Sequence, residues 1–209
     1  MKKLFVLFIV FILFVSCKNE QNAQSFYVKA LDSYSKQDFS KAIENIDLSL
    51  KYSCDFYQAK FLKAKILFFL NESEKSLKII NSLVKKYPEY TEARIWKIRL
   101  LIDLKQYEKA ESMLDRELSF NPSDWRLYYQ YSLLSERKEQ MDKRLVMLNK
   151  ASFYISESYN VYVELADLWI KLGIRSSAIE NLDKAIMISN GKDELKQVRD
   201  FLREGKDLQ

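Results

Sequence analysis

The chain has 209 residues, of which 30% are charged and 48% are apolar, and its formal net charge is +5. This balance excludes an intrinsically disordered chain and a multi-span membrane protein. The chain contains only 3 Gly and 2 Pro, far below the usual shares of about 7% and 5%. We therefore expect it to be nearly all helix with short connections. The absence of His removes the commonest general base and the commonest metal ligand.

Residues 1–16 are predicted to form a targeting segment. Lys2 and Lys3 precede an unbroken apolar run over residues 4–15. As a helix this run would rise only about 18 Å, which is short of a bilayer core of about 30 Å. A signal peptide is therefore favoured over a membrane-spanning helix.

Residues 13–17, with the sequence LFVSC, resemble a bacterial lipobox, in which a small residue precedes a cysteine that is diacylated and becomes the mature N-terminus. Phe14 departs from the usual Leu at its position. The resemblance implies lipidation at Cys17 and a stable membrane anchor. Two or three acyl chains bind a membrane stably, whereas a single chain gives only marginal, reversible binding. The open alternative is a plain secretory signal with Cys17 incidental. Residues 17–24 are then expected to be the lipidated N-terminus followed by a polar tether.

Residues 23–190 repeat with a period of 34 residues. The clearest copy covers residues 165–186, where Gly173 separates two apolar runs at helical spacing. Earlier copies place equivalent residues in register with Ala178 and Leu182. These residues are Arg144, Ala110, Ser76 and Ala42 in the first series, and Leu148, Leu114, Ile80 and Ile46 in the second. A helix–turn–helix period of about 34 residues is the signature of the tetratricopeptide repeat (TPR), and the sequence resembles that family.

The resemblance implies an all-α fold, a right-handed α-solenoid of about five TPR helical hairpins plus a C-terminal capping helix. Five copies in register disfavour the alternative of a generic helical bundle with accidental periodicity. Arg144 replaces the usual small residue in the fourth repeat, which predicts a local distortion there. Asn190 and Gly191 form a helix-stop signal. Residues 191–209 are expected to be a capping helix and tail that cover the last repeat.

The sequence offers no catalytic constellation. Without His, neither a Ser-His-Asp nor a Cys-His arrangement is possible, and three isolated glycines cannot build a phosphate-binding loop. No concentrated basic patch is present, so nucleic-acid binding is not predicted. We expect no catalytic residue, no metal site, no cofactor and no enzymatic activity. Cys54 is expected to be a small, partly buried residue in an inter-repeat turn, or alternatively a free thiol for an intermolecular disulfide.

The resemblance also implies a partner-binding concave face, lined by the first helix of each repeat. Aromatic, aliphatic and cationic residues on this face would suit a peptide with apolar anchors and acidic residues. For any one of them, notably Phe69 and its neighbour Phe68, the alternative is packing between repeats. The expected face consists of Tyr27, Leu31, Tyr34, Phe61, Lys65, Phe68, Phe69, Ile95, Arg99, Ile102, Arg126, Tyr129, Leu133, Arg137, Val163, Asp167 and Ile170.

TPR arrays that hold the acidic tails of heat-shock chaperones use a clamp of Lys and Asn. The equivalent clamp positions here carry aromatic or aliphatic residues, so binding of cytosolic chaperones is not expected. These positions are Tyr27, Phe61, Ile95, Tyr129 and Val163.

Taken together, the sequence resembles a bacterial TPR lipoprotein. The resemblance implies a scaffold in the bacterial cell envelope, lipid-anchored at the periplasmic face or the cell surface, that binds other envelope proteins or peptide segments in its groove. One subfamily with this layout assists assembly of outer-membrane β-barrels and shares the Tyr-Pro pair within residues 86–93; a second helps secretin or pilus assembly. The alternatives are a surface-exposed lipoprotein that binds extracellular or host partners, and an accessory subunit of a cell-wall enzyme.

Overall fold

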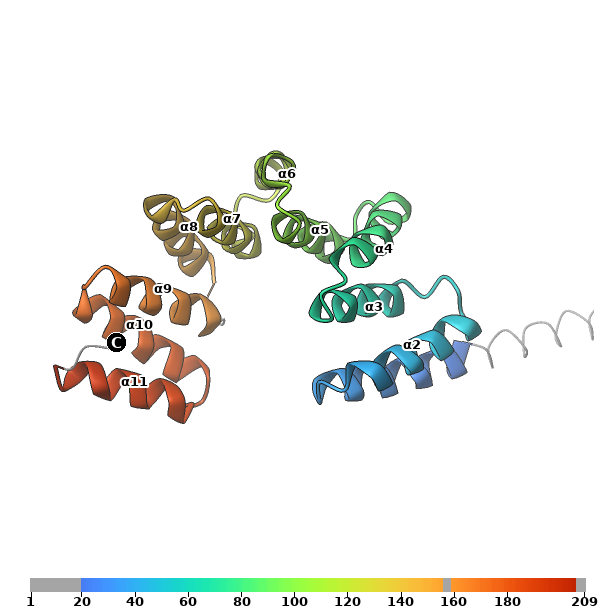
Figure 1. The fold of residues 1–209 in the computed structure, drawn as a ribbon, viewed down its shortest axis with the longest axis horizontal. Helices are drawn as coiled ribbons and strands as arrows, with labels where there is room; N and C mark the ends of the chain where they lie inside the picture. Colours follow the sequence, from blue (N-terminus) through green and yellow to red (C-terminus); the bar gives the residue numbers. More distant parts are fainter. Residues whose placement is uncertain (1–19, 156–158, 206–209) are drawn as a thin grey trace, which may run out of the picture. The chain divides into compact units, whose positions relative to one another are not determined.

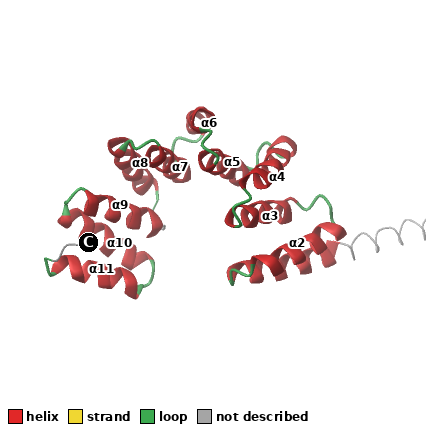
Figure 2. Cartoon of the chain, in the orientation of Figure 1, coloured by secondary structure: helices red, strands yellow, loops and turns green. Residues whose placement is uncertain are grey.

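The computed structural model describes residues 20–155 and 159–205, and every regular element within these ranges is a helix (Figures 1 and 2). The predicted all-α fold is therefore confirmed. The chain divides into two compact units, residues 1–104 and residues 105–209. None of the helices in the described ranges is long and apolar enough to cross a bilayer.

From residue 20 onward, where the description begins, the first unit contains a helix over residues 20–35 and four further helices. Within this unit α3 packs against both α2 and α4, and α4 packs against α5. Successive helices therefore contact their neighbours in chain order, as in a stack of hairpins. The four helices are α2 (Phe39–Tyr52), α3 (Tyr57–Phe69), α4 (Ser73–Lys86) and α5 (Thr91–Asp103).

The start of the first unit differs from the sequence-based expectation. The polar composition of residues 20–24 predicts a tether, but these residues are helical. Ala23 is only 1% exposed, and its carbonyl oxygen accepts a hydrogen bond of 2.7 Å from Ser49 Oγ on α2. The tether interpretation is wrong for these residues, because the helix gains a buried contact with α2 that their polar composition does not reveal. The predicted signal peptide and Cys17 lie outside the described residues.

Six helices lie in the described part of the second unit. The strongest packing within it joins α7 to α8 and α9 to α10. Where a capping helix is expected, α11 packs on α10, and Leu195, Val198 and Leu202 join a cluster with buried residues of α9 and α10. The helices are α6 (Tyr107–Phe120), α7 (Trp125–Arg137), α8 (Met141–Tyr154), α9 (Tyr159–Lys171), α10 (Arg175–Ile188) and α11 (Asp193–Arg203).

The 34-residue period coincides with the buried core in both units. The two series of equivalent positions lie near the start and the middle of α2, α4, α6, α8 and α10. Every member of both series is at most 4% exposed. Small side chains in the first series let neighbouring helix backbones approach closely. At Ser76 the close approach also permits a hydrogen bond between helices: its Oγ donates to the carbonyl oxygen of Ala64 on α3 at 2.7 Å.

The turns that precede these helices also repeat. One residue in each turn has a left-handed backbone, with φ between 58° and 72°. At the first turn Asp38 N donates to Ser33 O at 3.0 Å, and at the last Ile174 N donates to Trp169 O at 2.8 Å. This six-residue closure is the Schellman motif, which satisfies carbonyl groups at a helix end. The left-handed residues are Gln37, Asn71, Lys105, Glu139 and Gly173, so glycine is present only in the last of the five turns.

Arg144 occupies the small-residue position of the fourth repeat without breaking α8, which is continuous from Met141 to Tyr154. The side chain is buried, and its guanidinium lies 3.3 Å from Glu136 on α7 and 2.7 Å from Glu164 on α9. The two carboxylates compensate the buried charge. The predicted distortion of the helix is therefore wrong, because paired acids from both neighbouring helices accommodate the bulk and charge.

We predict that Ala178→Arg destabilises the protein strongly. One period after Glu136 and Glu164, the chain carries Ile170 and Val198. An arginine at position 178 would therefore be buried without a carboxylate, at a cost of about 3–5 kcal/mol in the free energy of unfolding. Urea denaturation would measure the loss. The control Ser176→Arg, at an exposed position of the same turn, should change stability by no more than about 0.5 kcal/mol. Equal stability of the two variants would contradict the register.

Candidate functional site

An aromatic cluster lies on the first unit, where the helix over residues 20–35 meets α2, α3 and α5. Phe69 stacks on Phe39 with ring centroids 5.7 Å apart, and it also contacts Tyr34 at 6.1 Å. Trp96 contacts Phe68 edge-on at 5.5 Å and Phe69 at 6.5 Å. These separations are in the favourable range for aromatic pairs. Phe69 is nevertheless 46% exposed, so the cluster presents apolar surface to solvent.

Two cations lie among these rings. Lys65 Nζ is 5.0 Å from the Tyr34 ring centroid and 5.7 Å from that of Trp96, and Arg99 Cζ is 5.7 Å from the Phe68 centroid. Such distances give cation–π attraction. Neither cation has a carboxylate partner among the described residues. We call the surface formed by Tyr34, Phe39, Lys65, Phe68, Phe69, Trp96 and Arg99 the cationic aromatic face.

The local sequence explains why these side chains meet. Lys65 and Phe69 are four residues apart on α3, and Trp96 and Arg99 are three apart on α5, so each pair shares a helix face. The 34-residue period then aligns the two helices, because Lys65 and Arg99 occupy equivalent repeat positions. The face is thus a product of helical spacing and repeat register together.

Ring contacts extend from this face along α3 and α5. Phe61 lies 6.2 Å from Trp96 and 5.3 Å from Tyr90, and Tyr90 in turn lies 5.2 Å from Tyr57. Burial, and secondarily the charge of Glu92, raises the pKa of the Tyr90 hydroxyl well above its usual value. Like an ordinary tyrosine hydroxyl, it is protonated at neutral pH and can donate a hydrogen bond.

Other expected residues of the first unit are placed differently. Tyr27 packs against Phe56 at 4.9 Å with the two rings tilted, and burial raises the pKa of its hydroxyl. Leu31 is 39% exposed. Ile95 and Ile102 are 8% and 3% exposed. The expectation that these two isoleucines face a partner is wrong: they are core residues, because α5 buries apolar side chains on more than one of its sides.

In the second unit the expected residues do not assemble into a comparable cluster. Arg126 is held by Asp124, with Nε to Oδ1 at 2.9 Å, and Asp167 pairs with Lys171 at 2.8 Å. Arg126 and Asp167 are thus each paired with an oppositely charged residue close by in sequence. Among the remaining positions, Tyr129 and Ile170 pack against buried clusters, Leu133 and Val163 are partly buried, and Arg137 is exposed.

Further charges of the second unit stabilise the fold. Glu111 on α6 accepts hydrogen bonds from Lys138 Nζ at 2.7 Å, from Lys143 Nζ at 2.8 Å and from the Tyr131 hydroxyl at 3.1 Å. These donors, Lys138 first, lower the pKa of Glu111 to about 2. The carboxylate therefore stays ionised and joins α6, α7 and α8. Lys138 and Lys143 are committed to this internal network, in contrast to Lys65 and Arg99.

Sequence reasoning missed two members of the cationic aromatic face. Phe39 begins α2, a second helix of a repeat, and Trp96 lies one residue beyond an expected position. Trp96 Nε1 is buried without a hydrogen-bond partner among the described residues. The spacing of Trp96 three residues before Arg99 was the available signal. Cys54, expected to be partly buried, is an exposed free thiol, so that expectation is wrong.

The arrangement of the cationic aromatic face suits recognition of a ligand. No group of three or more potential metal-ligating side chains occurs among the described residues. What the cationic aromatic face offers is two positive charges beside exposed ring surface. Such a surface can bind a carboxylate whose neighbours are apolar, because the rings bury the apolar part while the cations attract the charge.

The structure is similar to known repeat proteins. TTC0263, a thermophilic TPR protein of Thermus thermophilus, shares 18% identity, with 87% of this chain and 99% of that chain covered at a TM-score of 0.75. PilW, described as a widely conserved type IV pilus biogenesis factor, shares 18% identity, with 85% and 82% covered at a TM-score of 0.65. The chain has the tetratricopeptide-repeat fold.

Sequence comparison adds a distant relative. The mouse mitochondrial import receptor subunit TOM70 is 24% identical over 126 residues, which is 60% of this chain and 21% of that protein. The chain therefore spans about a fifth of the length of this curated relative. No protein-family model matches the sequence. The comparisons therefore show the TPR fold of this chain.

Proposed function

We propose that this protein is a membrane-anchored TPR scaffold of the bacterial cell envelope that binds a segment of another protein on its cationic aromatic face. The observation that carries this proposal is the pair of unpaired cations, Lys65 and Arg99, held over aromatic rings. In ordinary surface ion pairs the charge is already partly neutralised, as it is for Lys171 by Asp167. Here the neutralising group is left for a ligand to supply.

The ligand chemistry follows from the same residues. A peptide carboxylate can accept hydrogen bonds from the Lys65 ammonium and the Arg99 guanidinium, and charge-assisted bonds are stronger than neutral ones. The exposed ring of Phe69 can bury an apolar side chain next to that carboxylate. The preferred segment is therefore acidic with aromatic or aliphatic neighbours. The role is binding, and no group on this face is arranged for proton transfer or nucleophilic attack.

The anchor and the location rest on the sequence. The segment LFVSC at residues 13–17 supports acylation of Cys17, and with it attachment to an envelope membrane. Among the folds that resemble this one, PilW is described as a pilus biogenesis factor. That likeness supports a more specific proposal, that the scaffold assists assembly of a complex in the outer membrane.

We predict that purified full chain in detergent binds synthetic peptides that combine Asp with Phe and Leu. Fluorescence anisotropy of a labelled peptide would measure the affinity. Replacing both cations, Lys65→Gln with Arg99→Gln, should weaken binding at least about tenfold, because a charge-assisted hydrogen bond contributes about 1.5–3 kcal/mol. The matched control is Lys97→Gln, which removes a cation two residues from Arg99 on another side of α5; it should bind normally.

A peptide with Asn in place of Asp provides the complementary control. It should bind weakly, and its affinity should be indifferent to the two substitutions, because the carboxylate that the cations recognise is gone. If the double variant bound the acidic peptide as tightly as the unchanged chain, the cationic aromatic face would not be the binding surface.

We predict that Cys17→Ala abolishes metabolic labelling with a radioactive fatty acid in a bacterial host and prevents signal-peptide processing at residue 17. The reason is that the thiol is the acyl acceptor and the first mature residue in the lipobox interpretation. Cys54→Ala serves as the control and should leave labelling intact. Label that persisted in the Cys17 variant would place the lipid elsewhere and contradict the proposed anchor.

A further inference from the structure

The second unit carries an unusual row of exposed apolar side chains. Phe120, Phe153 and Met187 are 75%, 81% and 76% exposed, and no other large apolar side chain among the described residues exceeds 54%. They lie in the last turns of α6, α8 and α10 respectively. Tyr154, 42% exposed, adds to the row next to Phe153. Exposed apolar patches of this kind mark contact surfaces for proteins or membranes.

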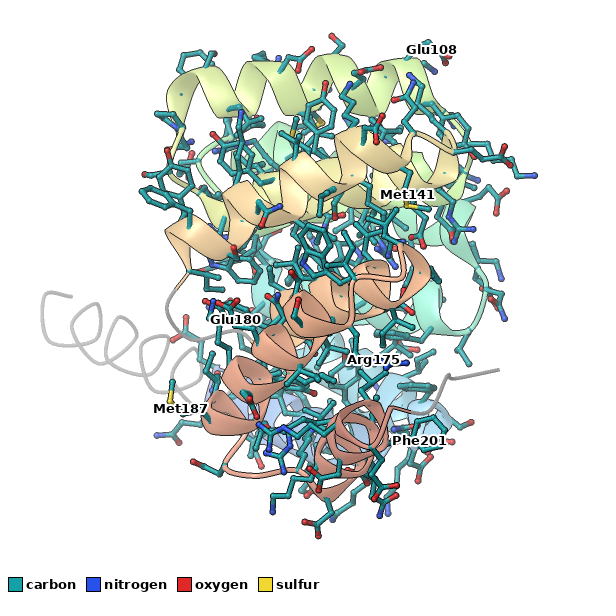
Figure 3. All side chains as sticks on the ribbon, turned by 90° about the vertical axis from the view of Figure 1, so that its left-hand side faces the viewer. Glu108, Met141, Arg175, Glu180, Met187 and Phe201 are labelled. Atoms are coloured by element: carbon teal, nitrogen blue, oxygen red, sulfur yellow. The ribbon has the colours of Figure 1, made fainter. Side chains whose placement is uncertain are left out.

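These residues lie along one edge of the unit. Figure 3 shows α6, α8 and α10 starting on one side, near Glu108, Met141 and Arg175, and ending on the other, where Met187 protrudes. Phe153 and Met187 are one repeat period apart, so they occupy the same position on successive second helices. Phe120 and Tyr154 are likewise one period apart, at the next repeat position. The row therefore follows the repeat along one edge.

The fold itself does not require apolar residues at these positions. The position shared by Phe153 and Met187 is occupied in the other repeats by Lys51, Lys85 and Ser119. Phe120 lies one repeat position later, where the second repeat carries Lys86. The repeat therefore accepts polar side chains at both positions. A contact outside the unit would account for apolar residues there.

Cations accompany the row one turn earlier on each helix. Arg116, Lys150 and Lys184 occupy a single repeat position, four, three and three residues before Phe120, Phe153 and Met187. Lys150 Nζ lies 5.6 Å from the Tyr128 ring centroid and has no carboxylate partner among the described residues. Lys184 pairs with Glu180 at 2.8 Å, and Arg116 lies 3.7 Å from Glu117.

A fourth cation lies at the same edge. Lys192 Nζ donates a 2.8 Å hydrogen bond to the Tyr159 hydroxyl and lies 4.3 Å from its ring centroid. Asp193 and Glu194 follow it, and Asp193 is paired with Lys196 at 3.0 Å. The edge therefore combines protruding apolar tips with positive charge, although acids offset part of that charge.

We propose that this edge docks on an anionic lipid bilayer, with Phe120, Phe153 and Met187 entering the interface and Lys150 facing lipid phosphate. Each apolar tip is mostly surrounded by solvent, so the row does not form the recessed surface that a rigid protein partner would fill. A bilayer accepts protruding side chains at any spacing, and buried apolar area plus attraction of cations to anionic lipid gives peripheral binding. The proposal does not depend on acylation of Cys17 or on the cationic aromatic face.

The test is a depth measurement on the full chain. With Cys17→Ser and Cys54→Ser as background, a single cysteine at Phe153→Cys would carry an environment-sensitive fluorophore. The protein would be reconstituted into vesicles of phosphatidylcholine and phosphatidylglycerol in equal amounts, with or without brominated lipid. We expect a blue shift and quenching by the brominated lipid. The matched control, Met141→Cys at the other end of α8, should show neither effect.

Charge dependence gives a second readout. Vesicles of phosphatidylcholine alone, or the substitution Lys150→Glu in anionic vesicles, should reduce the blue shift and the quenching of the Phe153→Cys label. If that label remained as exposed to water as the Met141→Cys label, or if both labels were quenched equally, docking through this edge would be overturned. Either result would leave lipid anchoring and peptide binding untouched.

Discussion

The close crossing of successive helices is the constraint on which the rest of the structure depends. At one position per repeat a side chain must fit between helix backbones with almost no exposure to solvent, and Ala42, Ala110 and Ala178 are fully buried there. Ser76 meets the constraint with a hydrogen bond to a backbone carbonyl, and Arg144 meets it with two carboxylates. Because interiors are densely packed, each solution is specific to its neighbours.

This constraint separates structural positions from those available for recognition. The crossing residues and the left-handed turns fix how successive helices pack, so other positions can vary between repeats. In the first unit they carry rings and unpaired cations, whereas in the second unit Glu111, Glu136 and Glu164 engage the nearby cations in internal ion pairs. The two units therefore share one repeat pattern but differ in surface chemistry, which suits different contacts.

Much of the fold was predictable from the sequence, because the packing of successive helices determines both the 34-residue period and which side chains are buried. The residues that recur every 34 positions are the ones the helices bury, and the stop at Asn190 and Gly191 precedes α11. The helix start by residue 20 was not predictable, because its polar sequence conceals the buried contact of Ala23 with Ser49. The partners of Arg144 were also hidden, since Glu136 and Glu164 lie on two other helices.

The candidate site was predictable only in part. Lys65, Phe69 and Arg99 follow from their repeat positions, but the same positions gave Ile95 and Ile102, which are buried. A positional pattern assumes that every first helix exposes the same face, whereas α5 is apolar on several sides. Trp96 was missed for the converse reason, because its side chain reaches the face from a neighbouring position.

The central claim is that the cationic aromatic face holds a protein segment in the cell. Photo-crosslinking in living bacteria tests it most directly, with a photoreactive amino acid replacing Phe69 and, as a control, replacing Leu48 on α2, which is 40% exposed. The account predicts a specific protein adduct from position 69 that is absent from position 48 and is lost when Lys65 and Arg99 are both replaced by Gln. An adduct that forms equally from both positions, or that survives the loss of the two cations, would contradict it.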